Sequence, residues 1–340
     1  MTYIMQNDRP ILEFPKPIRK VALWHVTSRC NMECKYCYGS FDGKSYKNNY
    51  SKSDLTVKTM FSAVDYLHDM GVERLHLCGG EPFLYNHFVD LLARIKTKKM
   101  ESFVLTNLTM LPNYIEQLFT DELMTNLSFS LDSLDENYNM AMRGTHKNVI
   151  DNIHQVITFK KKHSSPIELG LYVVVTKKNL QLLIPLINWA IENGIEYISL
   201  QAVYLPREHK YYQELALSAD DSIVLENVFL YLTQQGNKIR ISGALMQFIT
   251  RILLTDDNNL SIKQCFVEQN SQYFFILGDG KIKSCPAKSD TIGNIATDDF
   301  PMKKNNIDIK SICSTFCLDC IGVWEMVYPC ETNDIIRRLK

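Results

Sequence analysis

Three cysteines near the amino terminus have the spacing of a metal-binding loop. Cys30, Cys34 and Cys37 lie within eight consecutive residues, directly after the apolar run 21–26. Thiolates are the usual ligands of 4Fe–4S clusters, and three in so short a loop can each reach a different iron of one cube. No fourth cysteine is near in the sequence, so one iron is expected to stay open to a cofactor or substrate.

Six more cysteines crowd the last quarter of the chain, and Cys78 stands alone between the two groups. A disulfide framework is the alternative interpretation. The chain is long, however, no basic-then-apolar leader opens it, and no cysteine lies between Cys78 and Cys265. In a reducing compartment, clustered thiols are more typical of metal ligands. The sequence therefore favours metal binding in a cytoplasmic protein.

Composition restricts the class of partner. The 340 residues carry a formal net charge of −1, which indicates neither a nucleic-acid nor a membrane partner. The longest apolar runs, such as 182–190, are too short to span a bilayer. The length suits one large domain and a smaller one.

Strand-like and helix-like segments alternate along most of the chain. Strands are predicted at 21–26, 74–78, 102–106, 126–131, 168–175 and 197–203. Ser53 is the predicted N-cap of a helix that Gly71 ends, and the other helices are predicted near 88–95, 111–120, 145–163, 180–193 and 219–235. This alternation predicts an α/β fold, a partial (β/α)6 TIM-like barrel with its chemistry at the carboxyl ends of the strands.

The pattern changes after residue 236. Segments 273–276 and 282–285 flank a turn at Gly278-Asp279-Gly280 and predict a hairpin. The rest is irregular and cysteine-rich, as expected of a small domain that bound metal stabilises. We therefore divide the chain into an extension (1–19), a barrel (20–236) and a small cysteine-rich C-terminal domain (237–340).

The first cysteine motif, with Tyr36 before its last cysteine, resembles the signature of the radical S-adenosylmethionine (SAM) superfamily. That resemblance implies that the open iron of a 4Fe–4S cluster binds SAM. Gly79-Gly80-Glu81, followed by proline, also resembles a family motif that presents backbone groups to the SAM amino group. Paired glycines suit this role because a side chain would block close approach. A zinc knuckle is the alternative for the cysteines, and a simple turn for the glycines.

Polar residues at the ends of later strands resemble further SAM contacts of the family. Asn107, Ser130 and Asp132 match positions facing the ribose and carboxylate of SAM, and Arg143 matches an arginine that pairs with the carboxylate. Helix caps or surface salt bridges are the alternatives. For Cys78 we favour a buried packing role over one as a hydrogen donor to a radical.

The C-terminal cysteines resemble the auxiliary-cluster domains called SPASM and twitch. Six thiols supply one complete cluster with two to spare, or two clusters that each lack a ligand, and a structural zinc site is the alternative. The resemblance implies one or two auxiliary iron–sulfur clusters held by Cys265, Cys285, Cys313, Cys317, Cys320 and Cys330.

The expected activity is reductive cleavage of SAM to a 5′-deoxyadenosyl radical, followed by hydrogen abstraction from a substrate. A flavodoxin- or ferredoxin-type protein is the expected electron donor. The preferred substrate is a ribosomally made peptide that is cross-linked, epimerised or oxidised, although the short extension 1–19 offers no room for a separate peptide-recognition domain. The alternatives are a dehydrogenase or epimerase acting on a sugar, alcohol or tetrapyrrole, and a non-catalytic metal-binding module.

Overall fold

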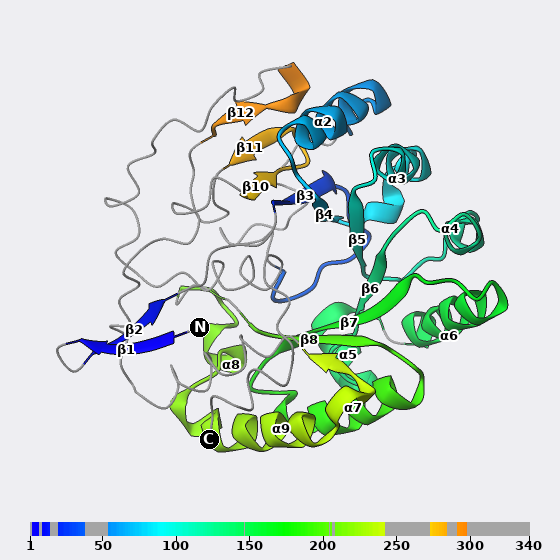
Figure 1. Ribbon diagram of the computed structural model, residues 1–340. Helices are drawn as coiled ribbons and strands as arrows, with labels where there is room; N and C mark the ends of the chain where they lie inside the picture. Colours follow the sequence, from blue (N-terminus) through cyan, green and yellow to red (C-terminus); the bar gives the residue numbers. More distant parts are fainter. Residues whose placement is uncertain are drawn as a thin grey trace.

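The computed structural model describes residues 2–6, 9–13, 20–37, 54–145, 147–203, 205, 208–241, 273–283 and 291–297. Most of their strands form one curved sheet, ordered β12-β11-β10-β3-β4-β5-β6-β7-β8-β9 (Figure 1). Its neighbouring strands are parallel from β10 through β9. Because β9 and β12 are its two ends and do not pair with each other, the sheet is an open, partial barrel. This confirms the predicted fold class.

The six predicted strands occupy the centre of this sheet. They are β3 (Val21–Thr27), β4 (Arg74–Gly79), β5 (Glu101–Thr106), β6 (Asn126–Ser130), β7 (Glu168–Val175) and β8 (Tyr197–Ala202). Each bound agrees with the sequence prediction to within one residue. Since all six strands run in the same direction, their carboxyl ends meet at one edge of the barrel.

Helices cover the outer face of the sheet (Figure 1). They are α2 (Val57–Asp69), α3 (Phe88–Thr97), α4 (Ile115–Thr120), α5 (Glu136–Arg143), α6 (Lys147–Lys162), α7 (Leu183–Glu192) and α9 (Ser222–Gln234), with the single turn α8 (Tyr212–Leu215) between α7 and α9. Alternate strand residues such as Trp24, Leu75 and Leu77 are fully buried against this layer and form the main core. The intervening residues therefore face the inside of the barrel.

Several helix starts differ from the predictions: α4 begins at Ile115 and not near 111, and α9 begins at Ser222 and not near 219. Thr56, and not Ser53, caps α2, because its side-chain oxygen accepts a hydrogen bond from the Thr59 N–H at 3.2 Å. Helix α5 was not predicted, and the segment expected as a helix from 145 begins at Lys147. Gly71 does end α2, in the left-handed conformation with φ 77°.

Short strands from the two ends of the chain complete the fold. Strands β10 (Tyr273–Ile276) and β11 (Lys281–Lys283) form the predicted hairpin. Strand β10 also pairs in parallel with β3, while β9 (Arg240–Ile241) pairs with β8 and β12 (Gly293–Asn294) with β11. In the extension, β1 (Thr2–Gln6) and β2 (Arg9–Glu13) form a separate antiparallel hairpin. All six C-terminal cysteines lie outside the described residues, and the proposed domain division stays a prediction.

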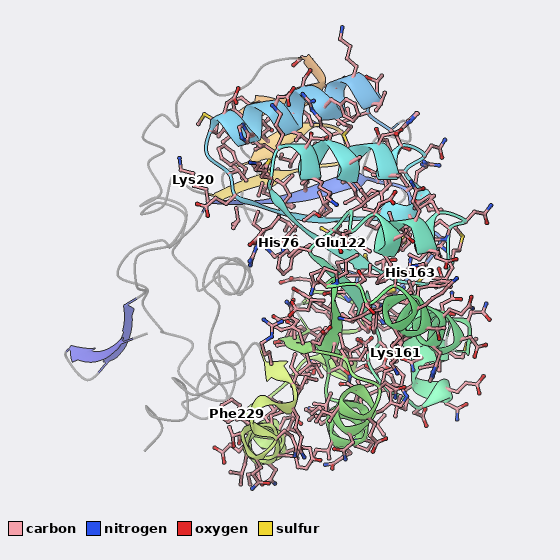
Figure 2. All side chains as sticks on the ribbon, turned by 45° about the vertical axis from the view of Figure 1, so that its right-hand side comes forward. Lys20, His76, Glu122, Lys161, His163 and Phe229 are labelled. Carbon is pink, nitrogen blue, oxygen red and sulfur yellow. The ribbon has the colours of Figure 1, made fainter. Side chains whose placement is uncertain are left out.

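The inner face of the sheet carries aromatic and polar side chains. Figure 2 shows His76 on the side of the sheet opposite Glu122 and His163, which lie among the helices. The His76 ring packs against the Phe103 ring, and their centroids lie 5.1 Å apart, a spacing typical of aromatic pairs. Among the described helices, none combines the length and apolar character required to cross a bilayer.

Candidate metal and cofactor site

The loop that leaves β3, residues 28–37, carries the three amino-terminal cysteines to the carboxyl edge of the barrel. Cys30, Cys34 and Cys37 are partly buried and form no disulfide with any described residue. The Met32 N–H donates to Cys30 Sγ at 3.4 Å, and Asn107 Nδ2 lies 4.0 Å from the same sulfur. N–H groups directed at a ligand sulfur stabilise its thiolate form and tune the cluster potential.

The chemistry of these donors suits a 4Fe–4S cluster. Within the described part of the chain, no three His, Cys, Asp or Glu side chains gather closely enough to hold a single metal ion. A cube needs no such convergence, because each thiolate binds a different iron. Burial raises the pKa of the Cys34 thiol to about 11, with the charge of Arg143 opposing the rise. Cluster binding must therefore displace a proton from this thiol.

The first turn of the cysteine loop is anchored by residues that sequence reasoning missed. Thr27 Oγ1 donates to Asp54 Oδ1 at 2.6 Å, and the Arg29 N–H donates to Thr27 Oγ1 at 3.1 Å. The Arg29 guanidinium binds both the Asp54 carboxylate and the carbonyl oxygen of Leu84. No spacing rule connects Asp54 or Leu84 with the cysteines, so only the fold brings these groups together.

The predicted glycine motif packs directly against the same turn. The Gly80 N–H donates to Thr27 O at 2.9 Å, and the Glu81 N–H donates to Arg29 O at 2.8 Å. A Cβ on Gly80 would lie 2.0 Å from Arg29 O, and Gly79 has a φ of 134° that side chains rarely adopt. Glycine is required at both positions because the two loops approach each other closely.

The carboxylate of Glu81 joins this motif to the end of β5. It accepts hydrogen bonds from Thr106 Oγ1 at 2.7 Å, the Asn107 N–H at 2.8 Å and the Phe83 N–H at 3.1 Å. Burial raises the pKa of Glu81 to about 7, although all three donors favour the ionised form. Glu81 is thus turned into the protein, and the backbone of the motif is the part that faces the cysteine loop.

Asn107 and Ser130 stand at the carboxyl ends of β5 and β6. Asn107 Nδ2 donates to Asn31 Oδ1 at 2.9 Å, and its Oδ1 accepts from Thr109. These bonds place the Asn107 side chain beside Cys30 in the cysteine loop. Ser130 is half-buried at the last position of β6. Their contacts to SAM stay predictions.

Asp132, Arg143 and Tyr36 form a buried polar cluster beside Cys34. Arg143 Nε donates to Asp132 Oδ2 at 2.5 Å, and Arg143 Nη2 donates to Oδ1 at 3.0 Å. The Tyr36 hydroxyl donates to the same carboxylate, and its ring centroid lies 5.5 Å from the guanidinium carbon of Arg143. Although burial opposes the charge of Arg143, the anionic Asp132 raises its pKa well above the usual value. The arginine therefore stays charged in the site.

An apolar wall closes the site next to this cluster. It packs Tyr36 against residues from α5, α8 and the segment after β8: Tyr138, Met142, Val203, Leu205 and Leu215. The Lys35 ammonium lies 5.1 Å from the ring centroid of Tyr211, and the Lys35 N–H donates to Met142 O at 3.0 Å. This apolar cover keeps water from one side of the cysteine loop, which suits chemistry that water would quench.

Two further groups line the inner face close to the site. Burial lowers the pKa of His25 to about 4, so its ring is neutral, and it packs edge-on against Phe275 of β10 at 5.0 Å. Burial raises the pKa of Cys78 to about 12, which keeps its thiol protonated. The Cys78 side chain is partly buried, and the packing role that we favoured for it stays a prediction.

Comparison with known proteins agrees with this geometry. The family model described as "Radical SAM superfamily" matches residues 24–190, which include the cysteine loop and the glycine motif. The structure of Streptococcus suis SuiB bound to precursor peptide SuiA superposes with a TM-score of 0.66 at 18% identity, covering 94% of this chain and 73% of SuiB. At this identity, the likeness concerns the fold.

The curated relatives match this chain over different shares of their own lengths. Fe-coproporphyrin III synthase of Methanosarcina barkeri is 23% identical to this chain, and the match covers 50% of this chain and 41% of the length of the synthase. A probable GTP 3′,8-cyclase of Sulfurisphaera tokodaii is 26% identical to this chain, and the match covers 84% of this chain and 87% of the length of the cyclase. The chain spans about half the length of the first curated relatives that it matches. Together with the motif geometry, these matches assign a radical SAM domain to residues 24–190 of the chain.

Proposed function

We propose that this protein is a radical SAM enzyme whose 4Fe–4S cluster is bound by Cys30, Cys34 and Cys37. The observation that carries the proposal is the packing of the cysteine loop on the glycine motif, with Gly80 and Glu81 donating to Thr27 and Arg29. This packing puts three thiols and an accessible backbone edge at the same end of the barrel. When bound, the reduced cluster supplies one electron that splits SAM into methionine and a 5′-deoxyadenosyl radical, which takes a hydrogen atom from the substrate.

The residues of the chain would bind SAM and exclude water from the site. The Gly80 N–H already donates to Thr27 O, so the carbonyl oxygens at Gly79 and Gly80 would be the acceptors for the SAM amino group. The charged Arg143 would bind the SAM carboxylate, a pairing that suits a guanidinium. The apolar wall around Tyr36 excludes water from the radical. A small flavodoxin- or ferredoxin-type protein would deliver the electron that reduces the cluster.

A ribosomally made peptide is the substrate that we prefer. SuiB, whose fold this chain shares over 94% of its length, was solved with a precursor peptide bound. The second candidate is a small molecule, since the curated relatives include a coproporphyrin synthase and a probable GTP cyclase. The two can be separated by deuterium transfer from labelled peptides, nucleotides and tetrapyrroles into 5′-deoxyadenosine.

We further propose that the six C-terminal cysteines hold one or two auxiliary clusters, as the sequence pattern indicates. The anaerobically reconstituted protein should then contain about 8 or about 12 irons, at four per cube. Replacing Cys285 with alanine should remove about 4 of these irons and leave SAM cleavage in place. Zinc in place of iron would support a non-catalytic metal-binding module instead.

The decisive test is the formation of 5′-deoxyadenosine by the reduced protein. Cys34→Ala should abolish it, because the cluster loses one of its three ligands and SAM has no open iron to bind. Cys78→Ala is the matched control, since it also removes one partly buried thiol near the site. It should retain both iron and 5′-deoxyadenosine formation. Product formation that persists in Cys34→Ala would overturn the assignment.

A further inference from the structure

The side chain of Asp132 is completely enclosed, and protein donors occupy both of its oxygens. Oδ1 accepts from the Val174 N–H at 2.7 Å and from Arg143 Nη2 at 3.0 Å. Oδ2 accepts from Arg143 Nε at 2.5 Å and from the Tyr36 hydroxyl. With an exposure of 0% and four donors in place, the carboxylate has its acceptor sites filled.

The donors to Asp132 come from three separate parts of the site. Tyr36 belongs to the cysteine loop, Arg143 ends α5, and Val174 lies near the end of β7. The backbone of Asp132 is fixed as well, because its carbonyl oxygen accepts from Asn179 Nδ2 at 3.0 Å. One carboxylate therefore connects the cysteine loop with α5 and with β7 near its carboxyl end.

Arg143 keeps hydrogen-bonding capacity after pairing with Asp132. A guanidinium has five N–H groups, of which Nε–H and one N–H of Nη2 point to Asp132. Its planar fork is held in one orientation by this bidentate contact and by the Tyr36 ring. The remaining N–H groups can bind a second carboxylate without any rotation of the side chain.

We propose that Asp132 is a positioning residue, which fixes Arg143 and Tyr36 for SAM binding and does not itself contact SAM. This inference rests on the proposed function, because it takes SAM as the ligand. It withdraws the SAM contact expected of Asp132 and keeps the carboxylate contact expected of Arg143. Removal of the Asp132 charge should let the guanidinium turn and leave the tyrosine hydroxyl without its acceptor, so SAM should bind more weakly at an intact cluster.

The experiment titrates SAM alone into the reduced, reconstituted full-length protein and follows the EPR signal of the cluster, which shifts when SAM coordinates the open iron. In Asp132→Asn, half-saturation should need about 10- to 100-fold more SAM, a range typical of residues that orient a ligating group. Iron content and the SAM-free EPR spectrum should match those of the wild type. Asp135→Ala is the control for α5, since Asp135 caps that helix through a 2.6 Å bond from the Tyr138 N–H. It should lower thermal stability without changing the SAM titration.

A double-mutant cycle separates positioning from direct contact. If Asp132 acts through Arg143, Asp132→Asn should weaken SAM binding by no more than about 3-fold in an Arg143→Lys background. An equal loss in both backgrounds would show that Asp132 contributes independently and would overturn the inference. Should Asp132→Asn fail to fold, Tyr36→Phe removes only the hydroxyl, and a wild-type SAM titration for that variant would also overturn it. A wild-type protein without any SAM-induced EPR shift would instead refute the proposed function.

Discussion

Replacing Gly80 with alanine should damage the site although it leaves every predicted metal-ligating side chain in place. The added Cβ would lie 2.0 Å from Arg29 O, 2.5 Å from Arg29 C and 3.0 Å from Cys30 N. All three atoms belong to the backbone, so no side chain can rotate to relieve the contact. The cysteine loop and the glycine motif would have to move apart by about 1 Å.

The cost of this separation can be worked out from the contacts that it breaks. Overpacking of this kind costs about 1–3 kcal/mol. The hydrogen bond from the Glu81 N–H to Arg29 O, 2.8 Å long, would also weaken, at about 0.5–1.5 kcal/mol. Together these give about 1.5–4.5 kcal/mol, which lowers Tm by several degrees for a chain of this size.

Iron content and SAM binding are the informative measurements, because they report the loop itself. Gly80→Ala should hold less iron after reconstitution and require more SAM to shift the EPR signal. Gly144→Ala is the matched control: Gly144 has a φ of 78°, so alanine strains the end of α5, but no atom lies within 4 Å of its added Cβ. It should lose stability and keep its iron. Wild-type iron content and SAM binding in Gly80→Ala would refute the reasoning.

Three further outcomes follow from contacts around the site. Because the folded-state pKa of Glu81 is raised from 4.5 to about 7 by burial, wild-type stability should fall as pH rises through this window, by at most about 3 kcal/mol. Glu81→Gln should flatten that dependence in urea titrations, and an unchanged slope would contradict the burial argument. Gly278→Ala would put a Cβ 2.4 Å from Ser28 Oγ and 2.9 Å from Ser28 N, so its Tm should fall, with only partial recovery on adding Ser28→Ala. Asp54→Asn should speed iron release to a chelator, because Arg29 loses its ionic partner, while the circular dichroism spectrum stays unchanged.

The strands were predictable because their buried side chains, which pack against the helices or on both faces of the sheet, form short apolar runs in the sequence. The sequence located β3, β4, β5, β6, β7 and β8 to within a residue. Helix α5 was missed although its signals are present: Asp135 is its N-cap, Arg143 lies in its last turn and Gly144 follows with a φ of 78°. Its eight residues bury only Tyr138, Asn139 and Met142, so the apolar periodicity is weak.

The site was predictable only where a motif is local in the sequence. The cysteine spacing and the paired glycines are short patterns with a direct physical reason. The anchors Asp54 and Leu84 and the Val174 N–H that binds Asp132 reach the site through tertiary structure alone. The environment of Asp132 also depends on this packing, which turns a residue expected to face the cofactor into one that is fully enclosed.

The pairing of β10 with β3 has a consequence for how the protein is made. Val21 is aligned with Tyr273, so the first barrel strand to leave the ribosome receives its outer neighbour some 250 residues later. Until then β3 presents an unpaired edge, which is prone to mispairing with other chains. Gly278 packs against Ser28 at the start of the cysteine loop, and this contact also forms only at that late stage. We therefore expect iron loading to favour released chains over nascent ones, and a chain shortened before residue 273 to lose iron and to aggregate.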